Sequence, residues 1–147
     1  MAPNVLVVDD DPYVRETISI HLRNAGYDVR TSNNGIEAGY AVLRKRPDLI
    51  IMDVQMPYMD GFELLAALRG DDDTSNIPVM MLTSQDDWHE RGRMLGANCF
   101  VTKPIFADKL LELVAIHMAP AASRRRPAAD GNGLDMLPGP LALRPVA

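Results

Sequence analysis

Four apolar segments of the sequence each end in a side chain that can bind or transfer a charged group. Short runs of large apolar residues are typical of strands that are buried on both faces of a sheet. In an open parallel sheet, the strand ends that face ligands lie along one edge, so the four endings are expected to converge there. They are Asp9 with Asp10 after Val5–Val8, Asp53 after Leu49–Met52, Thr83 after Val79–Leu82, and Lys103 after Cys99–Thr102.

Together these side chains would form an acidic cluster with one hydroxyl and one cation. Carboxylates that lie close together repel one another, and one is driven toward protonation unless a cation neutralises it. A hard divalent ion fits best, since Mg²⁺ usually binds one or two carboxylates together with phosphate oxygens and water. Lys103 and Thr83 are suitable partners for the oxygens of a phosphoryl group. The set therefore predicts a phosphoryl-transfer site with Mg²⁺ as its cofactor.

The segments between these strands have the spacing of helices, so the sequence predicts an α/β fold of alternating strands and helices. A short further strand lies near Val29, which gives five strands and five helices. Side chains that can cap a helix stand before each of the first four helical segments. These caps are Asp11, Asn34, Asp60 and Ser84, and the last helix is expected over about 106–118.

Composition indicates one folded domain over residues 1–118 and a flexible tail or linker over residues 119–147. The chain has 147 residues, of which 47% are apolar, and Cys99 is its one cysteine. After residue 118 the sequence becomes rich in Pro, Gly and Ala, and such a composition cannot bury enough apolar surface to offset the entropy of ordering.

Charge argues against a nucleic-acid partner for the folded part. Residues 1–118 hold 11 Lys and Arg against 18 Asp and Glu, and Arg124–Arg126 is the basic run of the tail. Phosphate contacts need clustered cations, so we expect no nucleic-acid binding by this domain. No apolar stretch approaches membrane-spanning length and no signal-peptide pattern is present, so we expect a cytoplasmic protein without membrane contact.

The segments VVDDD, DLIIMDVQMPYMDG, VMMLTS and FVTKP resemble, in order and spacing, the receiver domain of bacterial two-component response regulators. The resemblance covers roughly residues 3–118 and rests on all four motifs together. It implies the CheY-like fold, in which a five-stranded parallel sheet with the flavodoxin-like strand order 2-1-3-4-5 carries helices on both faces.

The resemblance also implies a role for each residue of the site. It makes Asp53 the acceptor of a phosphoryl group from a histidine kinase or a histidine phosphotransfer domain. The chain is then a phosphoacceptor that promotes its own phosphotransfer and slow dephosphorylation, not an enzyme in the usual sense. The further roles are Mg²⁺ binding by Asp9, Asp10, Asp53 and the Gln55 carbonyl, phosphoryl contact by Lys103, switching by Thr83 and Phe100, tuning of hydrolysis by Gln55 and Gln85, and a cis peptide bond before Pro104.

The expected output is contact with a downstream protein through the fourth helix, the fifth strand and the fifth helix. A homodimer is left open. A single-domain regulator that acts by protein contact is slightly favoured over the N-terminal receiver of a longer regulator. Phe100 stands where the family often has tyrosine, so the aromatic switch is expected to be less sharply two-state, because phenylalanine has no hydroxyl to bond.

Two other functions are less consistent with the sequence. A haloacid-dehalogenase-like phosphatase would use Asp9 and Asp11 as its acid pair, but Pro12 follows them and the segment ending at Thr83 lacks the further acids of that family. A receiver that binds partners without phosphorylation is disfavoured because all five expected site residues are present.

Overall fold

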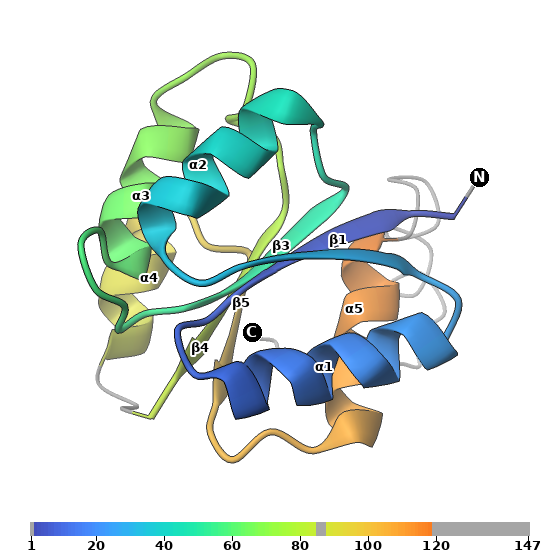
Figure 1. The fold of residues 1–147 in the computed structure, drawn as a ribbon. Helices are drawn as coiled ribbons and strands as arrows, with labels where there is room; N and C mark the ends of the chain where they lie inside the picture. Colours follow the sequence, from blue (N-terminus) through green and yellow to red (C-terminus); the bar gives the residue numbers. More distant parts are fainter. Residues whose placement is uncertain (1, 85–87, 119–147) are drawn as a thin grey trace, which may run out of the picture.

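The structure, a computed structural model, describes residues 2–84 and 88–118 of the chain. Strands and helices alternate along the described residues, as the sequence predicts (Figure 1). The elements are β1 (Asn4–Val8), α1 (Pro12–Asn24), β2 (Asp28–Ser32), α2 (Gly35–Arg44), β3 (Leu49–Asp53), α3 (Gly61–Arg69), β4 (Val79–Thr83), α4 (His89–Leu95), β5 (Cys99–Thr102) and α5 (Ala107–Met118).

The five strands form one parallel sheet in the order β2-β1-β3-β4-β5, which confirms the expected fold. Helices α1 and α5 cover one face of the sheet, and α2, α3 and α4 cover the other (Figure 1). Because parallel strands are joined by crossover helices, both faces of the sheet are covered. The carboxyl ends of all five strands consequently lie along the same edge.

Successive residues of the central strands belong to different cores, because side chains alternate between the two faces of a strand. Leu6, Val8 and Ile50 pack with α2 and α3, whereas Val5 and Val7 pack with α1 and α5. All five residues of β1, β3 and β4 are buried, which explains why these strands are continuous apolar runs in the sequence.

Three of the four predicted helix caps are confirmed. The Asp11 carboxylate accepts a hydrogen bond from the backbone N–H of Tyr13 at 2.9 Å. Helix α2 is capped by Asn34, and Asp60 forms a reciprocal capping box with Glu63 at the start of α3.

The prediction that Ser84 caps the fourth helix is wrong. Helix α4 begins at His89, and Trp88 at its N-terminus makes no capping bond with its side chain. The indole of Trp88 instead packs edge-on against the ring of Phe62 on α3, with ring centroids 5.9 Å apart. Packing against α3 therefore holds the start of this helix, and a capping pattern in the sequence cannot report such a contact.

Two further expectations concern residues that the structure leaves undescribed. Gln85 and the predicted tail over residues 119–147 both lie outside the described residues. Within residues 2–84 and 88–118, every helix is too short or too polar to cross a lipid bilayer.

Candidate functional site

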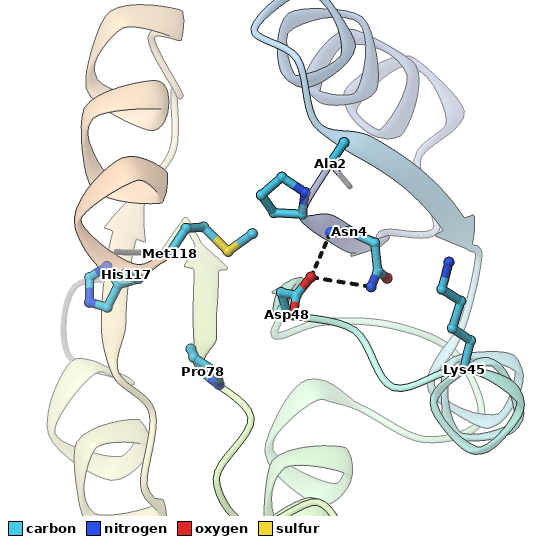
Figure 2. A pocket seen from close by; sticks show the side chains of 8 residues that line it. Ala2, Asn4, Lys45, Asp48, Pro78, His117 and Met118 are labelled. Carbon is cyan, nitrogen blue, oxygen red and sulfur yellow. Dashed lines mark hydrogen bonds between the residues drawn. The ribbon is translucent and has the colours of Figure 1, made fainter. Parts of the chain in front are cut away.

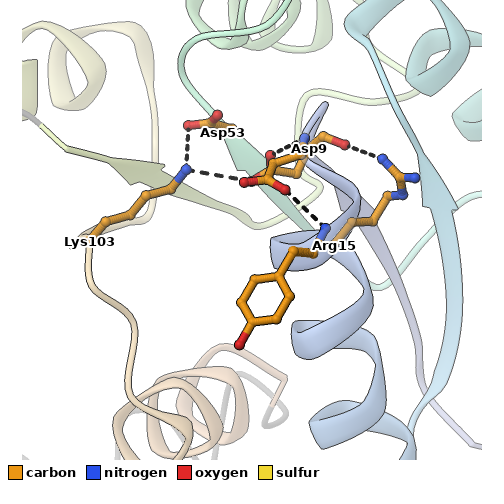
Figure 3. A network of polar contacts seen from close by, with 6 residues as sticks. Asp9, Arg15, Asp53 and Lys103 are labelled. Carbon is orange, nitrogen blue, oxygen red and sulfur yellow. Dashed lines mark hydrogen bonds and ion pairs between the residues drawn. The ribbon is translucent and has the colours of Figure 1, made fainter.

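The charged side chains at three strand ends lie together at one edge of the sheet (Figure 3). The Nζ atom of Lys103, just after β5, is 3.4 Å from Oδ1 of Asp53 and 3.7 Å from Oδ2 of Asp9. Carboxylate oxygens of Asp9, Asp10 and Asp53 all lie within 4.8 Å of one another. Two buried acids, Asp9 and Asp53, thus share one ammonium group, and the carboxylate of Asp10 lies beside them.

The turn after β1 fixes the position of Asp9. Its Oδ1 atom accepts a hydrogen bond from the backbone N–H of Asp11 at 2.9 Å. Its backbone carbonyl accepts a second bond, at 2.7 Å, from the guanidinium of Arg15 (Figure 3). Sequence reasoning missed Arg15, whose only signal was a basic side chain in the first turns of the helix that follows the acidic pair.

The end of β3 is held against the start of α3 by a close backbone approach. The N–H of Gly61 donates to the carbonyl of Val54 at 2.8 Å. A Cβ atom on Gly61 would lie 2.5 Å from the carbonyl oxygen of Asp53, closer than two unbonded atoms can stand. Glycine at this position therefore allows α3 to begin directly behind Asp53.

Burial dominates the electrostatics of the two inner carboxylates. Burial and, to a smaller extent, the charge of Asp9 raise the pKa of Asp53 from 3.8 to about 6, although the Lys103 ammonium acts in the opposite direction. Burial also raises the pKa of Asp9, against the opposing hydrogen bond from Asp11. Without a further cation, the site therefore holds more negative charge than Lys103 can stabilise.

The donor atoms of the site fit a hard divalent cation. The buried Oδ2 atom of Asp9 accepts no hydrogen bond from the described residues, which is costly for a carboxylate oxygen away from water. Asp10 is exposed, so solvent and ions reach the cluster from its side. Carboxylate oxygens in such a group are the ligands that Mg²⁺ prefers.

Three further predictions concern residues near the acidic cluster, namely Thr83, Pro104 and Gln55. Thr83 is buried at the end of β4, and its carbonyl accepts a hydrogen bond from the N–H of Lys103 at 2.7 Å. The Lys103–Pro104 peptide bond is cis. Gln55 is exposed in the segment after β3.

Phe100 lies on β5 under α4. Its half-buried ring stacks on the imidazole of His89, with centroids 4.7 Å apart and planes at 26°. His89 also makes a hydrogen bond through Nε2 with the hydroxyl of Thr102, at 3.1 Å. Sequence reasoning singled out Phe100 but not His89, because the contact joins residues on two different elements.

Gly92→Ala should lower the free energy of unfolding by about 1–3 kcal/mol, the usual cost of overpacking. Gly92 is buried on α4, and a Cβ atom there would overlap the Phe100 ring. Urea unfolding followed by circular dichroism measures the change. Gly39→Ala on α2 is the matched control, because a Cβ there meets no atom within 4 Å, and alanine should add up to about 1 kcal/mol of helix propensity. Equal stability of the two variants would contradict the close contact.

A hollow at the opposite edge of the sheet, where the strands begin, has a different character (Figure 2). Its carboxylate, Asp48, accepts hydrogen bonds from the backbone N–H and the side-chain amide of Asn4, at 2.8 and 3.4 Å. The amide of Asn4 also donates to the carbonyl of Arg46. These bonds tie the start of β1 to the start of β3, so the hollow is explained by the fold.

Comparison with known protein families gives a match over most of the chain. The family model described as the response regulator receiver domain matches residues 5–115. Among curated proteins, the DNA-binding dual master transcriptional regulator RpaA of Synechocystis is 35% identical over 145 residues, which are 97% of this chain and 59% of RpaA. The chain thus spans about three fifths of the length of that relative.

Solved structures with the same fold include two receiver proteins. The chemotaxis response regulator CheY4 of Vibrio cholerae superposes with a TM-score of 0.76 at 34% identity, over 80% of this chain and 99% of that one. The receiver domain of the sensor histidine kinase PA1611 from Pseudomonas aeruginosa has a TM-score of 0.74 at 27% identity, over 80% and 98% of the two chains. That structure contains a magnesium ion coordinated in its active-site cleft.

Proposed function

The chain belongs to the response regulator receiver domain family, and from this premise we propose that it is a phosphorylation-dependent switch with Asp53 as its phosphoacceptor. The observation that carries the proposal is the position of Asp53. Its carboxylate stands at the end of a buried strand, 3.4 Å from the Lys103 ammonium and within 4.8 Å of the other two acids. An acid in such surroundings is suited to receive a phosphoryl group, since phosphoryl transfer depends on positioning and charge neutralisation.

The proposed donor is the phosphohistidine of a histidine kinase or of a phosphotransfer protein. A carboxylate oxygen of Asp53 attacks the phosphorus atom, the phosphorus–nitrogen bond of the donor breaks, and the imidazole leaves as the acyl phosphate forms. Lys103 lies close enough to Asp53 to contact an oxygen of the incoming group, where negative charge gathers in the transition state.

Asp9, Asp10, Asp53 and the backbone carbonyl of Gln55 would hold Mg²⁺. When it is bound, the ion supplies positive charge for the phosphoryl oxygens and offsets the repulsion among the acids. The buried Oδ2 atom of Asp9, which accepts no hydrogen bond from the described residues, supports this assignment. Asp9 itself is held for ligation by Asp11 and Arg15.

The acyl phosphate would act on the fold through Thr83 and Phe100. A new charged hydrogen bond from Thr83 to the phosphoryl group provides roughly 1.5–3 kcal/mol. Shifting a two-state equilibrium from about 1:99 to 99:1 requires about 5.5 kcal/mol, so Lys103 and a bound partner would supply the rest. Rotation of Phe100 must break its stacking on His89, which couples the switch to α4.

The proposed output surface is formed by α4, β5 and α5, and its partner is a downstream protein. Exposed apolar side chains on α4 and α5, Met94 and Ile116, support this assignment. Since the chain spans only part of the length of RpaA, a receiver that controls a further domain is as consistent with the comparisons as a single-domain regulator. In either case we place the domain in the cytoplasm, with its phosphodonor.

Asp53→Asn should abolish phosphorylation of the protein by acetyl phosphate in the presence of Mg²⁺. The asparagine amide cannot form the acyl phosphate, so intact-mass spectrometry should find one added phosphoryl group on the unchanged protein and none on the variant. Asp72→Asn, at an exposed loop position, is the control and should be labelled fully. Labelling that survives in Asp53→Asn, or steady release of phosphate over many turnovers, would contradict the proposal.

A further inference from the structure

Helix α2 carries an exposed apolar stripe on the side that faces away from the sheet. Ile36, Tyr40 and Leu43 are 46%, 63% and 76% exposed, and their spacing places them on one face of the helix. The opposite side of α2 is the buried one and packs on the sheet. Within the described residues nothing covers the stripe, and Figure 1 shows α2 at the outside of its layer.

Charged side chains flank the stripe in a particular order. Glu37 lies in the first turn of α2 and Arg44 is its last residue, and both are exposed. They are seven residues apart, which is about two helical turns, so they lie on the same flank of the stripe. Gly39 lies between Ile36 and Leu43 on the same face, and a Cβ there would meet no atom within 4 Å, so another helix can approach the backbone closely.

This arrangement is complementary to itself when two copies of the helix run antiparallel. A two-fold axis beside Tyr40 places Ile36 of one copy against Leu43 of the other. The same axis places Glu37 against Arg44 twice, so every residue finds an opposite or apolar partner, as an isologous interface requires. A parallel two-fold pair would instead place the charged flanks of the two copies on opposite sides of the interface, where Glu37 could not meet Arg44.

From this symmetry we propose that the α2 surface, defined as Ile36, Glu37, Gly39, Tyr40, Leu43 and Arg44, binds a second copy of this chain. The inference is independent of the phosphorylation proposed above, because none of these residues belongs to the acidic site. Three apolar side chains from each copy make an interface smaller than the roughly 1,600 Å² of stable complexes, so the dimer is weak and depends on concentration.

Sedimentation equilibrium of the full chain tests the proposal without any phosphodonor. At about 0.15 M salt, the average mass should rise from one chain toward two between about 10 μM and about 1 mM. Glu37→Arg alone places two arginines together at each end of the interface, and Arg44→Glu alone places two glutamates there. Each single variant should therefore remain monomeric over the same range.

An equal mixture of Glu37→Arg and Arg44→Glu should dimerise again, because the mixed pair restores opposite charges at both ends. A local folding defect in α2 could not be repaired by mixing, and far-UV circular dichroism checks that each variant is folded. The double variant, with both reversals in one chain, should also dimerise. A monomer at every concentration, a dimer that neither single reversal affects, or a mixture that stays monomeric would each overturn the proposal.

Discussion

Asp53→Asn is expected to raise the free energy of unfolding of the metal-free protein at pH 7 by about 2–3 kcal/mol. Burial and the charge of Asp9 raise the pKa of Asp53 from 3.8 to about 6, so folding at neutral pH forces a charged group into surroundings that disfavour it. A shift of roughly two pKa units corresponds to nearly 3 kcal/mol. Asparagine has almost the same shape and removes that cost.

The pH dependence of this difference has a definite sign. Because the folded protein holds the Asp53 proton up to a higher pH than the unfolded chain does, ionisation of Asp53 destabilises the unchanged protein increasingly as the pH rises from about 4 to about 6. The advantage of Asp53→Asn should therefore be close to zero near pH 4 and complete above pH 6. Urea unfolding in EDTA at a series of pH values measures the difference directly.

Two comparisons make this result specific to the site. Asp72→Asn, in an exposed loop, should follow the pH profile of the unchanged protein. Mg²⁺ at a saturating concentration should stabilise the unchanged protein more than Asp53→Asn, because the variant loses one of the proposed ligands. The measured quantity is the difference in free energy of unfolding between Asp53→Asn and the unchanged protein. If this difference were the same at pH 7 as at pH 4, then burial would not be raising the pKa of Asp53.

The fold could be predicted because its signals are local. Strands buried on both faces are continuous apolar runs, and the helices between them have their own caps at Asp11, Asn34 and Asp60. The convergence of Asp9, Asp53 and Lys103 then follows from parallel topology alone, since each ends or follows a strand of one sheet. Their chemical roles stay predictions, because a pattern of strand ends fixes positions and not reactions.

What the sequence did not reveal depends on contacts between distant elements. Arg15 binds the carbonyl of Asp9 and His89 stacks on Phe100, yet neither residue belongs to a motif. Helix α4 begins at His89, next to the contact of Trp88 with α3, and not directly after Ser84, the residue that the sequence predicts as its cap. Each of these features is set by tertiary packing between elements. Such packing produces no motif or hydrophobic periodicity that could be recognised in the sequence.

Lys103→Met should slow phosphorylation of Asp53 by acetyl phosphate by about 10²- to 10³-fold. Removing one preorganised donor for a developing negative charge typically has an effect of this size. The Lys103 ammonium is 3.4 Å from Asp53 and 3.7 Å from Asp9, and methionine keeps the length of the side chain without its charge. The initial rate of labelling, followed by intact-mass spectrometry at fixed Mg²⁺ and acetyl phosphate, measures the loss.

Lys109→Met provides the matched control, since Lys109 is an exposed lysine on α5 whose ion pair with Glu112 lies at the surface. Its rate should stay within about twofold of the unchanged protein, because a solvent-exposed ion pair contributes little.

Lys103→Met should also be less stable than the unchanged protein at pH 7 without metal, and this loss of stability should shrink when Asp53→Asn is added. The reason is that Lys103 stabilises a charge which the asparagine no longer carries. A slow rate without this coupling would show that Lys103 acts on the phosphodonor alone, whereas an unchanged rate would remove it from the reaction.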